Sequence, residues 1–200
     1  MKRILLCMLL VLTLSVLGCG PKRPGAIQPP AINPDKAGAD AIALYDKNGD
    51  GAISGAELDA TPALKASVSW VSKNGDGSIR ASDIADRIKL WRSTKIGLTT
   101  PSIQVRYGGK PVPSGKITLT PEPFLGSTFL PATGTITNGS ASVTCDPAKN
   151  PDNLPGMPVG FYTVTFEGVK NAPEKMGVEI FDQNPEYRKT SSYILELKVK

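Results

Sequence analysis

Two short segments carry oxygen-bearing side chains at matching positions, and they constrain the fold of this chain more than any other feature. In the first, residues 46–57 (loop one), these side chains belong to Asp46, Asn48, Asp50, Ser54 and Glu57. Gly51 lies among them, and glycine permits a sharp backbone turn. A second copy, residues 72–83 (loop two), follows at Ser72. Both segments must form tight loops rather than regular strands or long helices.

Loop one resembles the twelve-residue calcium loop of EF-hand proteins. The resemblance implies that Ca²⁺ is held by six residues, namely Asp46, Asn48, Asp50, Ala52, Ser54 and Glu57. Ala52 would contribute its backbone carbonyl, and the others their side chains. The alternative is a plain turn, since Asn-Gly and Asp-Gly pairs favour turns. The match at six fixed positions favours the calcium loop.

Loop two is a weaker copy. Its candidate metal ligands are Ser72, Asn74, Asp76, Ser78 and Asp83. Serine replaces the first aspartate, Arg80 brings a positive charge to the ninth position, and the last position holds the shorter Asp83. Calcium affinity follows ligand charge, so this loop is expected to bind weakly. Alternatively, it serves as a structural partner that pairs Ile79 with Ile53 and holds no metal.

Helix-forming segments flank both loops and define an EF-hand pair over residues 37–96. Helices are expected at 37–45, from 56, and at 81–93, with Thr61 as a cap and Pro62 as a first helical residue. Trp70 and Trp91 are expected to pack between helices. The stretch from Asp83 to Trp91 is also similar to dockerin modules. That similarity implies a calcium-dependent protein partner, bound through helix faces around Asp59 and Arg87.

The N-terminus has the pattern of an export signal. Lys2 and Arg3 precede an uncharged, leucine-rich stretch that is too short to span a membrane comfortably. Residues 16–19 (Val-Leu-Gly-Cys) resemble the lipobox of bacterial lipoproteins. The resemblance implies cleavage of a signal peptide, residues 1–18, and a membrane lipid attached to Cys19. An ordinary signal with an incidental cysteine, or an uncleaved anchor, are the alternatives.

The lipoprotein resemblance places the chain in the cell envelope, lipid-anchored and extracytoplasmic, at the outer membrane or cell surface. Residues 19–36 would then be a tether, because five prolines within residues 20–36 favour an extended, stiff chain.

From Thr99 onward, short alternating segments are separated by Gly, Pro and Asn. The apolar positions that alternate include Ile103, Val105, Ile117, Leu119, Ala141, Val143, Cys145, Tyr162, Val164, Phe166, Tyr193, Leu195 and Leu197. About seven strands in residues 97–200 predict an antiparallel β-sandwich. The expected fold class is therefore α+β with two domains, a short α-helical EF-hand pair followed by a seven-stranded sandwich.

Four stretches of this half resemble the carboxypeptidase regulatory-like, transthyretin-like β-sandwich of bacterial lipoproteins. They are residues 107–121, 135–144, 155–166 and 184–199. The resemblance implies a fold and no peptidase activity. Asn138-Gly139 and the glycines near Lys110 are interpreted as hairpin turns. Cys145 is expected to be a buried, unreactive thiol.

Composition excludes several functions. The chain has no histidine, which removes the usual general base and zinc ligand. Without Lys2 and Arg3, only a small, scattered positive charge remains, so nucleic acid is not an expected partner. We therefore expect a non-catalytic, membrane-anchored lipoprotein that binds calcium mainly for structure. The alternative is a dockerin-like assembly or adhesion module with an unknown protein partner.

Overall fold

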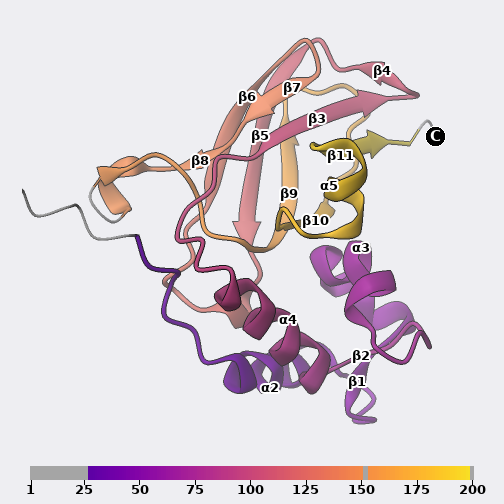
Figure 1. Cartoon of the computed structure of the whole chain (residues 1–200). Coiled ribbons are helices and arrows are strands. Elements are labelled where there is room, and N and C mark those ends of the chain that lie inside the picture. Colours follow the sequence, from indigo (N-terminus) through magenta and orange to yellow (C-terminus); the bar gives the residue numbers. More distant parts are fainter. Residues whose placement is uncertain (1–26, 151–152, 199–200) are drawn as a thin grey trace, which may run out of the picture.

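The computed structural model describes residues 27–150 and 153–198. The predicted signal peptide, Cys19 and the first part of the predicted tether lie outside the described residues. The described part combines α-helices with one curled β-sheet, and the helices lie against one end of that sheet (Figure 1). Within these residues, no helix combines the length and apolar character needed to cross a membrane.

Residues 34–93 form a helical layer that contains both predicted loops. Its elements are α2 (Pro34–Tyr45), β1 (Ala52–Ile53), the 3-10 helix η1 (Gly55–Ala60), α3 (Pro62–Val71), β2 (Ile79–Arg80) and α4 (Ala81–Ser93). The predictions for 81–93 and for a helix beginning at Pro62 are confirmed. The short helix after loop one is a 3-10 helix rather than an α-helix.

Helix α2 begins three residues earlier than predicted, inside the segment interpreted as tether. The Asn33 side chain accepts hydrogen bonds from the amides of Asp35 and Lys36, both at 3.1 Å. Pro34 occupies the first turn. An asparagine cap followed by proline favours the start of a helix, because the fixed φ of proline suits the first helical position. The tether prediction is therefore wrong for residues 34–36.

The remaining elements build the sheet and its connections. The strands are β3 (Ser102–Tyr107), β4 (Lys110–Pro111), β5 (Ser114–Pro121), β6 (Ala132–Thr137), β7 (Ser140–Ser142), β8 (Thr144–Cys145), β9 (Gly160–Glu167), β10 (Met176–Ile180) and β11 (Tyr193–Leu197). Two 3-10 turns, η2 (Pro123–Leu125) and η3 (Pro147–Lys149), and helix α5 (Pro185–Thr190) lie between them.

Hydrogen bonds join these strands into one sheet with the order β10-β9-β5-β6-β7-β3-β11, while β4 pairs with β3 and β8 with β6. Every pair is antiparallel except β11 with β3, which is parallel. The sheet curls, so that its two end strands contribute to the same apolar core (Figure 1). The antiparallel, many-stranded prediction is thus confirmed in its main feature.

Tight turns follow the predicted chemistry. Asn138 and Gly139 have φ of 49° and 79° between β6 and β7, and Gly108 and Gly109 have φ of 56° and 74° between β3 and β4. Two consecutive residues with positive φ form the turn that matches the twist of a hairpin. Both segments are therefore hairpin turns, as predicted.

Strands β9 and β10 are buried on both faces, and this joins the helices to the sheet. Tyr162 and Val178 face the core inside the curl. Their neighbours Phe161, Glu179 and Phe181 are buried on the opposite face, and the two phenylalanines pack with helical-layer residues. The alternation of apolar residues along these strands predicted burial of the inner face only. The second buried face appears because helices cover it.

The one cysteine in the described residues, Cys145 on β8, is 1% exposed. Its Sγ lies 3.3 Å from the Leu130 carbonyl oxygen. Burial raises the pKa of the thiol to about 11. The predicted burial of Cys145 is therefore confirmed, and the raised pKa favours the protonated thiol, which is the weaker nucleophile.

Candidate metal loops and their junction with the sheet

The two loops lie back to back through a two-stranded ribbon. Strands β1 and β2 are antiparallel, with Ile53 opposite Ile79 and Ala52 opposite Arg80. Both isoleucines are fully buried and belong to the core shared with the sheet. The predicted pairing of Ile53 with Ile79 is confirmed, so each loop supports the other.

In loop one, the first three candidate ligands fold back onto the loop backbone. The Asp46 carboxylate accepts hydrogen bonds from the amides of Gly49 at 2.7 Å and Gly51 at 2.8 Å. The Asn48 oxygen accepts from the Asp50 amide, and Asp50 accepts from the Ala52 amide at 2.9 Å. Gly51 has φ of +83°, which allows this tight path.

Glu57 closes loop one from its far end. Its Oε1 accepts hydrogen bonds from the amides of Lys47 at 2.8 Å and Asn48 at 3.2 Å. Its Oε2 accepts from the Ser54 amide at 3.0 Å. The last candidate ligand therefore reaches the loop's beginning. Helix η1 positions it, since Glu57 lies in the first turn of that helix.

The candidate ligands of loop one have the chemistry that calcium prefers. All six candidate ligands offer oxygen, which hard cations prefer. A carboxylate has about four lone-pair sites, so amide hydrogen bonds leave others for an ion. As the described residues lie, no three His, Cys, Asp or Glu side chains are gathered around one metal position. An ion at loop one would have to draw the carboxylates of Asp46, Asp50 and Glu57 together.

Loop two has different internal contacts. Asp76 Oδ1 accepts hydrogen bonds from the Ser78 amide at 3.0 Å, the Ser78 hydroxyl at 2.6 Å and the Ser72 hydroxyl at 3.3 Å. Its Oδ2 accepts from Arg80 Nη2 at 3.0 Å. The hydrogen bonds from Ser78 and Arg80 hold the pKa of Asp76 well below its usual range. Asn74 is exposed.

Asp83, the last candidate ligand of loop two, is 4% exposed. Its Oδ2 accepts a hydrogen bond from the Arg80 amide at 2.9 Å, much as Glu57 accepts from Ser54. The contacts across the loop that Glu57 makes in loop one have no counterpart among the hydrogen bonds of Asp83 in the described residues.

Behind the loops, one buried carboxylate connects three helical side chains to the sheet. Glu179 on β10 is 1% exposed. Arg87 of α4 donates to both of its oxygens, at 2.6 and 2.8 Å. The indole N–H groups of Trp70 and Trp91 each donate to one oxygen at 2.8 Å. Both tryptophans were expected in a core from the sequence, whereas Glu179 was not expected there. The signal was a lone acid inside the apolar run from Val178 to Phe181.

A second buried carboxylate lies where α2 meets the sheet. Glu122 is 3% exposed and accepts hydrogen bonds from the Tyr45 hydroxyl at 2.8 Å, the Thr163 hydroxyl at 2.9 Å and the Ala63 amide at 3.4 Å. Burial raises its pKa above the usual value of a glutamic acid. Tyr45 directly precedes Asp46, so this contact ties the entrance of loop one to the sheet.

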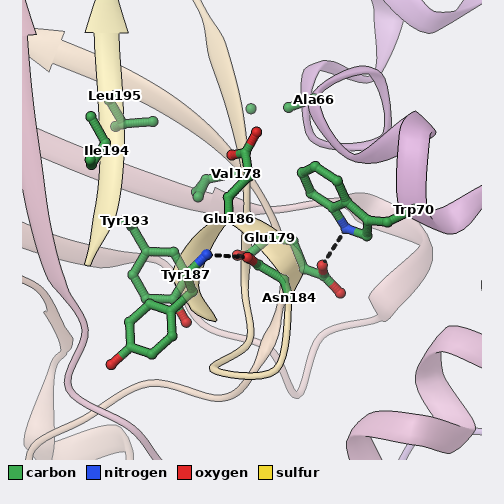
Figure 2. A pocket seen from close by; sticks show the side chains of 11 residues that line it. Ala66, Trp70, Val178, Glu179, Asn184, Glu186, Tyr187, Tyr193, Ile194 and Leu195 are labelled. Atoms are coloured by element: carbon green, nitrogen blue, oxygen red, sulfur yellow. Dashed lines mark hydrogen bonds between the residues drawn. The ribbon is translucent and has the colours of Figure 1, made fainter. Parts of the chain in front are cut away.

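The cavity beside Glu179 is small. It has a volume of about 40 Å³ and lies between α3, β10, α5 and β11 (Figure 2). Asn184 accepts a hydrogen bond from the Tyr187 amide there at 2.7 Å. Such a volume suits a few water molecules and is far below that of a typical ligand pocket.

A larger, open groove of about 920 Å³ lies along α3, β10 and the end of β11. Its lining includes both lysines and glutamates, with Lys65, Lys175, Glu186 and Glu196 among them. The mixed charges select no single class of ligand.

Compared with protein-family models, with curated proteins and with solved structures, the chain shows no match.

Proposed function

We propose that this chain is a membrane-anchored, extracytoplasmic lipoprotein that binds one structural calcium ion in loop one and has no catalytic role. The observation that carries the proposal is the set of oxygen ligands at Asp46, Asn48, Asp50, Ala52, Ser54 and Glu57, on a loop paired with a second copy. Lipid at Cys19 would hold the protein at the membrane.

A structural role for calcium is supported by what covers the helices. Phe124, Phe129, Phe161 and Phe181 pack in one core with the helical layer. In sensor proteins of the EF-hand type, calcium exposes an apolar groove for a partner. Here the apolar side of the helices is already covered by the chain's own sheet. Calcium would therefore stiffen an existing junction rather than open a new surface.

The expected energetics suit this role. Extracellular sites of this kind have Kd of about 10⁻⁴–10⁻³ M. At a hundredfold excess of calcium over Kd, binding adds about 2.7 kcal/mol to the free energy of unfolding. That is a large share of the stability of a small protein.

Two finer points of architecture belong to the proposal. The helical layer and the sheet would be two domains in evolutionary origin, and the curled sheet would correspond to a transthyretin-like sandwich. Both rest on the sequence patterns of residues 37–96 and 97–200.

A second candidate function is calcium-dependent assembly with a protein partner. Leu44 on α2 and Leu90 on α4 favour it, since they are 42% and 40% exposed. Arg87, which the dockerin similarity assigns to the contact face, has a side chain only 11% exposed and bound to Glu179. A partner would therefore use the leucines and Asp59, whose side chain is 64% exposed, rather than Arg87.

Calcium titration of the mature chain tests the proposal. We expect saturable heat in calorimetry and a rise in Tm, with Glu57→Gln losing both and Asp83→Asn keeping both. Trp70 and Trp91 report the same transition by fluorescence. If calcium produces neither heat nor a change in Tm, loop one is a turn and the proposal is wrong. Capture of a purified envelope protein by wild type, lost in chelator and in Leu90→Ser, would favour assembly instead.

The anchor is tested separately by mass spectrometry of the membrane-extracted protein. A diacylglycerol mass on Cys19, absent from Cys19→Ser, supports lipidation. An unmodified Cys19 in the membrane fraction contradicts it.

A further inference from the structure

Loop two carries its own cation at the position where loop one offers a calcium ligand. Arg80 is the ninth residue of loop two, and Ser54 is the ninth residue of loop one. The ribbon places Arg80 opposite Ala52 at the junction of the two loops. The Arg80 guanidinium donates to Asp76, which is itself a candidate metal ligand of loop two.

The comparison of Asp50 with Asp76, the fifth residue of each loop, shows what this cation does. Both carboxylates accept an amide from two residues ahead, at 2.9 Å from Ala52 and 3.0 Å from Ser78. The other oxygen of Asp50 accepts from the neutral Asn48 amide at 3.0 Å. The other oxygen of Asp76 accepts from the charged Arg80 at 3.0 Å.

Part of the Arg80 side chain lies against the loop, where Nη1 has no hydrogen-bond partner among the described residues. Its Nη1 atom is shielded from solvent, and the side chain is 41% exposed overall. Its backbone amide also donates to Asp83. Arg80 therefore contacts both carboxylates of loop two, one through the guanidinium and one through the main chain.

The charges of the two loops differ accordingly. Loop one has three carboxylates at ligand positions, and its Lys47 directs the ammonium to the Leu44 carbonyl outside the loop. Loop two has two carboxylates and the Arg80 guanidinium, while its Lys73 bonds Asp86 outside the loop. A divalent ion in loop two would meet a positive charge and two carboxylates, one of them already paired with that charge, whereas loop one offers three carboxylates.

We propose that Arg80 is the resident cation of loop two and limits the chain to one calcium ion. The guanidinium holds Asp76 in place of a metal and keeps loop two closed, so that Ile79 can support Ile53 whether or not calcium is present. This inference rests on the proposed function in one respect, the single ion in loop one. The role of Arg80 itself concerns loop two alone.

Calorimetric calcium stoichiometry of the mature chain tests the inference. We expect one ion for wild type, one for Arg80→Lys, which keeps the charge, and one for Ser72→Asp, which adds a carboxylate beside Arg80. The double variant Ser72→Asp/Arg80→Ser, which makes both positions match loop one, should bind two. Adding Glu57→Gln to that double variant should leave one ion, in loop two.

Thermal unfolding gives an independent readout. In chelator, the double variant should melt at a lower temperature than wild type, because loop two has lost its cation. Added calcium should remove this difference, because an ion would then take the place of the guanidinium in loop two. An unfolded variant would be recognised by loss of the melting transition, and Arg80→Ser alone then provides the comparison in chelator.

The outcomes separate the two proposals. Two ions in wild type, two in Ser72→Asp alone, or no more ions in the double variant than in wild type would each overturn the role of Arg80. No ion in wild type but one in the double variant would overturn the proposed site in loop one and support the role of Arg80.

Discussion

Glu179 and Glu122 are buried to a similar degree at the same helix–sheet junction, yet their surroundings differ. Glu179 meets a guanidinium and two indole N–H groups. Glu122 accepts from two hydroxyl groups and one amide, all neutral. A buried charge needs compensation, by a paired charge or by taking up a proton. Beside α3 and α4, the buried carboxylate of Glu179 is paired with a positive charge. Beside α2, the surroundings of Glu122 favour the protonated form of the carboxyl group.

The junction therefore depends on a charge pair at Glu179 and not at Glu122. Arg87 also lies over the Phe181 ring, with its Cζ 5.0 Å from the ring centre, so one side chain bonds the carboxylate and covers an aromatic ring. Near Glu122, the raised pKa means that protonation strengthens the folded state.

Glu179→Ala should be the most damaging change. It leaves the Arg87 guanidinium and two indole N–H groups buried without their acceptor, and breaking a buried ion pair costs about 3–5 kcal/mol. Urea unfolding followed by circular dichroism measures the loss. Glu167→Ala is the control, since its side chain is 81% exposed and meets Lys116 at 3.9 Å. Equal losses of unfolding free energy in Glu179→Ala and Glu167→Ala would show that the buried ion pair contributes no more than the exposed one.

Gly177→Ala tests the same side of the junction without removing a charge. A Cβ at Gly177 would overlap the Pro62 carbonyl at the start of α3, and neither backbone can easily move away. We expect a loss of about 1–3 kcal/mol in the free energy of unfolding, typical of overpacking. In the control Gly160→Ala, the new Cβ first meets side chains at 3.2–3.3 Å, which would have to shift by only a few tenths of an ångström. A larger loss at Gly160 would show that α3 does not approach β10 so closely.

Tyr45→Phe should cost about 1 kcal/mol, because it removes one hydrogen bond to Glu122 and leaves the ring in place. Losing this donor should also raise the pKa of Glu122 further. Urea unfolding at neutral pH measures the cost, with Tyr107→Phe as the control at an exposed hydroxyl. No loss relative to that control would mean that the Tyr45 hydroxyl contributes nothing to the junction.

In acid, Glu122→Gln should change the free energy of unfolding less than any other substitution described here. Its effect should grow as the pH rises. Because the pKa of Glu122 is raised in the folded chain, the unfolded chain loses this proton first, at about the usual value of 4.5. Wild type therefore loses stability relative to the glutamine variant as the pH rises from 4.5 through the raised pKa. Unfolding free energies of both proteins from pH 4 upward check this. If the stability of the glutamine variant relative to wild type fell as the pH rises, the prediction would be wrong.

Local signals in the sequence were sufficient for the loops, the hairpins and most helix boundaries. The spacing within each loop predicted that Ile53 would meet Ile79, and consecutive glycine or asparagine residues predicted the turns at 108–109 and 138–139. These features depend on residues a few positions apart, whose preferences are set by backbone conformation alone.

The junction could not be predicted in this way. Arg87 and Glu179 are 92 residues apart in the chain, and no local pattern specifies their contact. Phe161 lies on the strand face that alternation assigned to solvent, because alternation identifies one buried face and does not reveal a covering helix. The parallel pairing of β11 with β3 is equally hidden, since alternating residues look alike in either direction.

The buried thiol on β8 gives the folded sheet a natural reporter of its own opening. A small alkylating reagent can reach Cys145 only when β8 separates from β6 or Leu130 moves away. The labelling rate of this sulfur therefore measures how often that end of the sheet opens in the native protein. If loop one binds calcium as proposed, the ion would slow the labelling only if the helices and the sheet open as one cooperative unit.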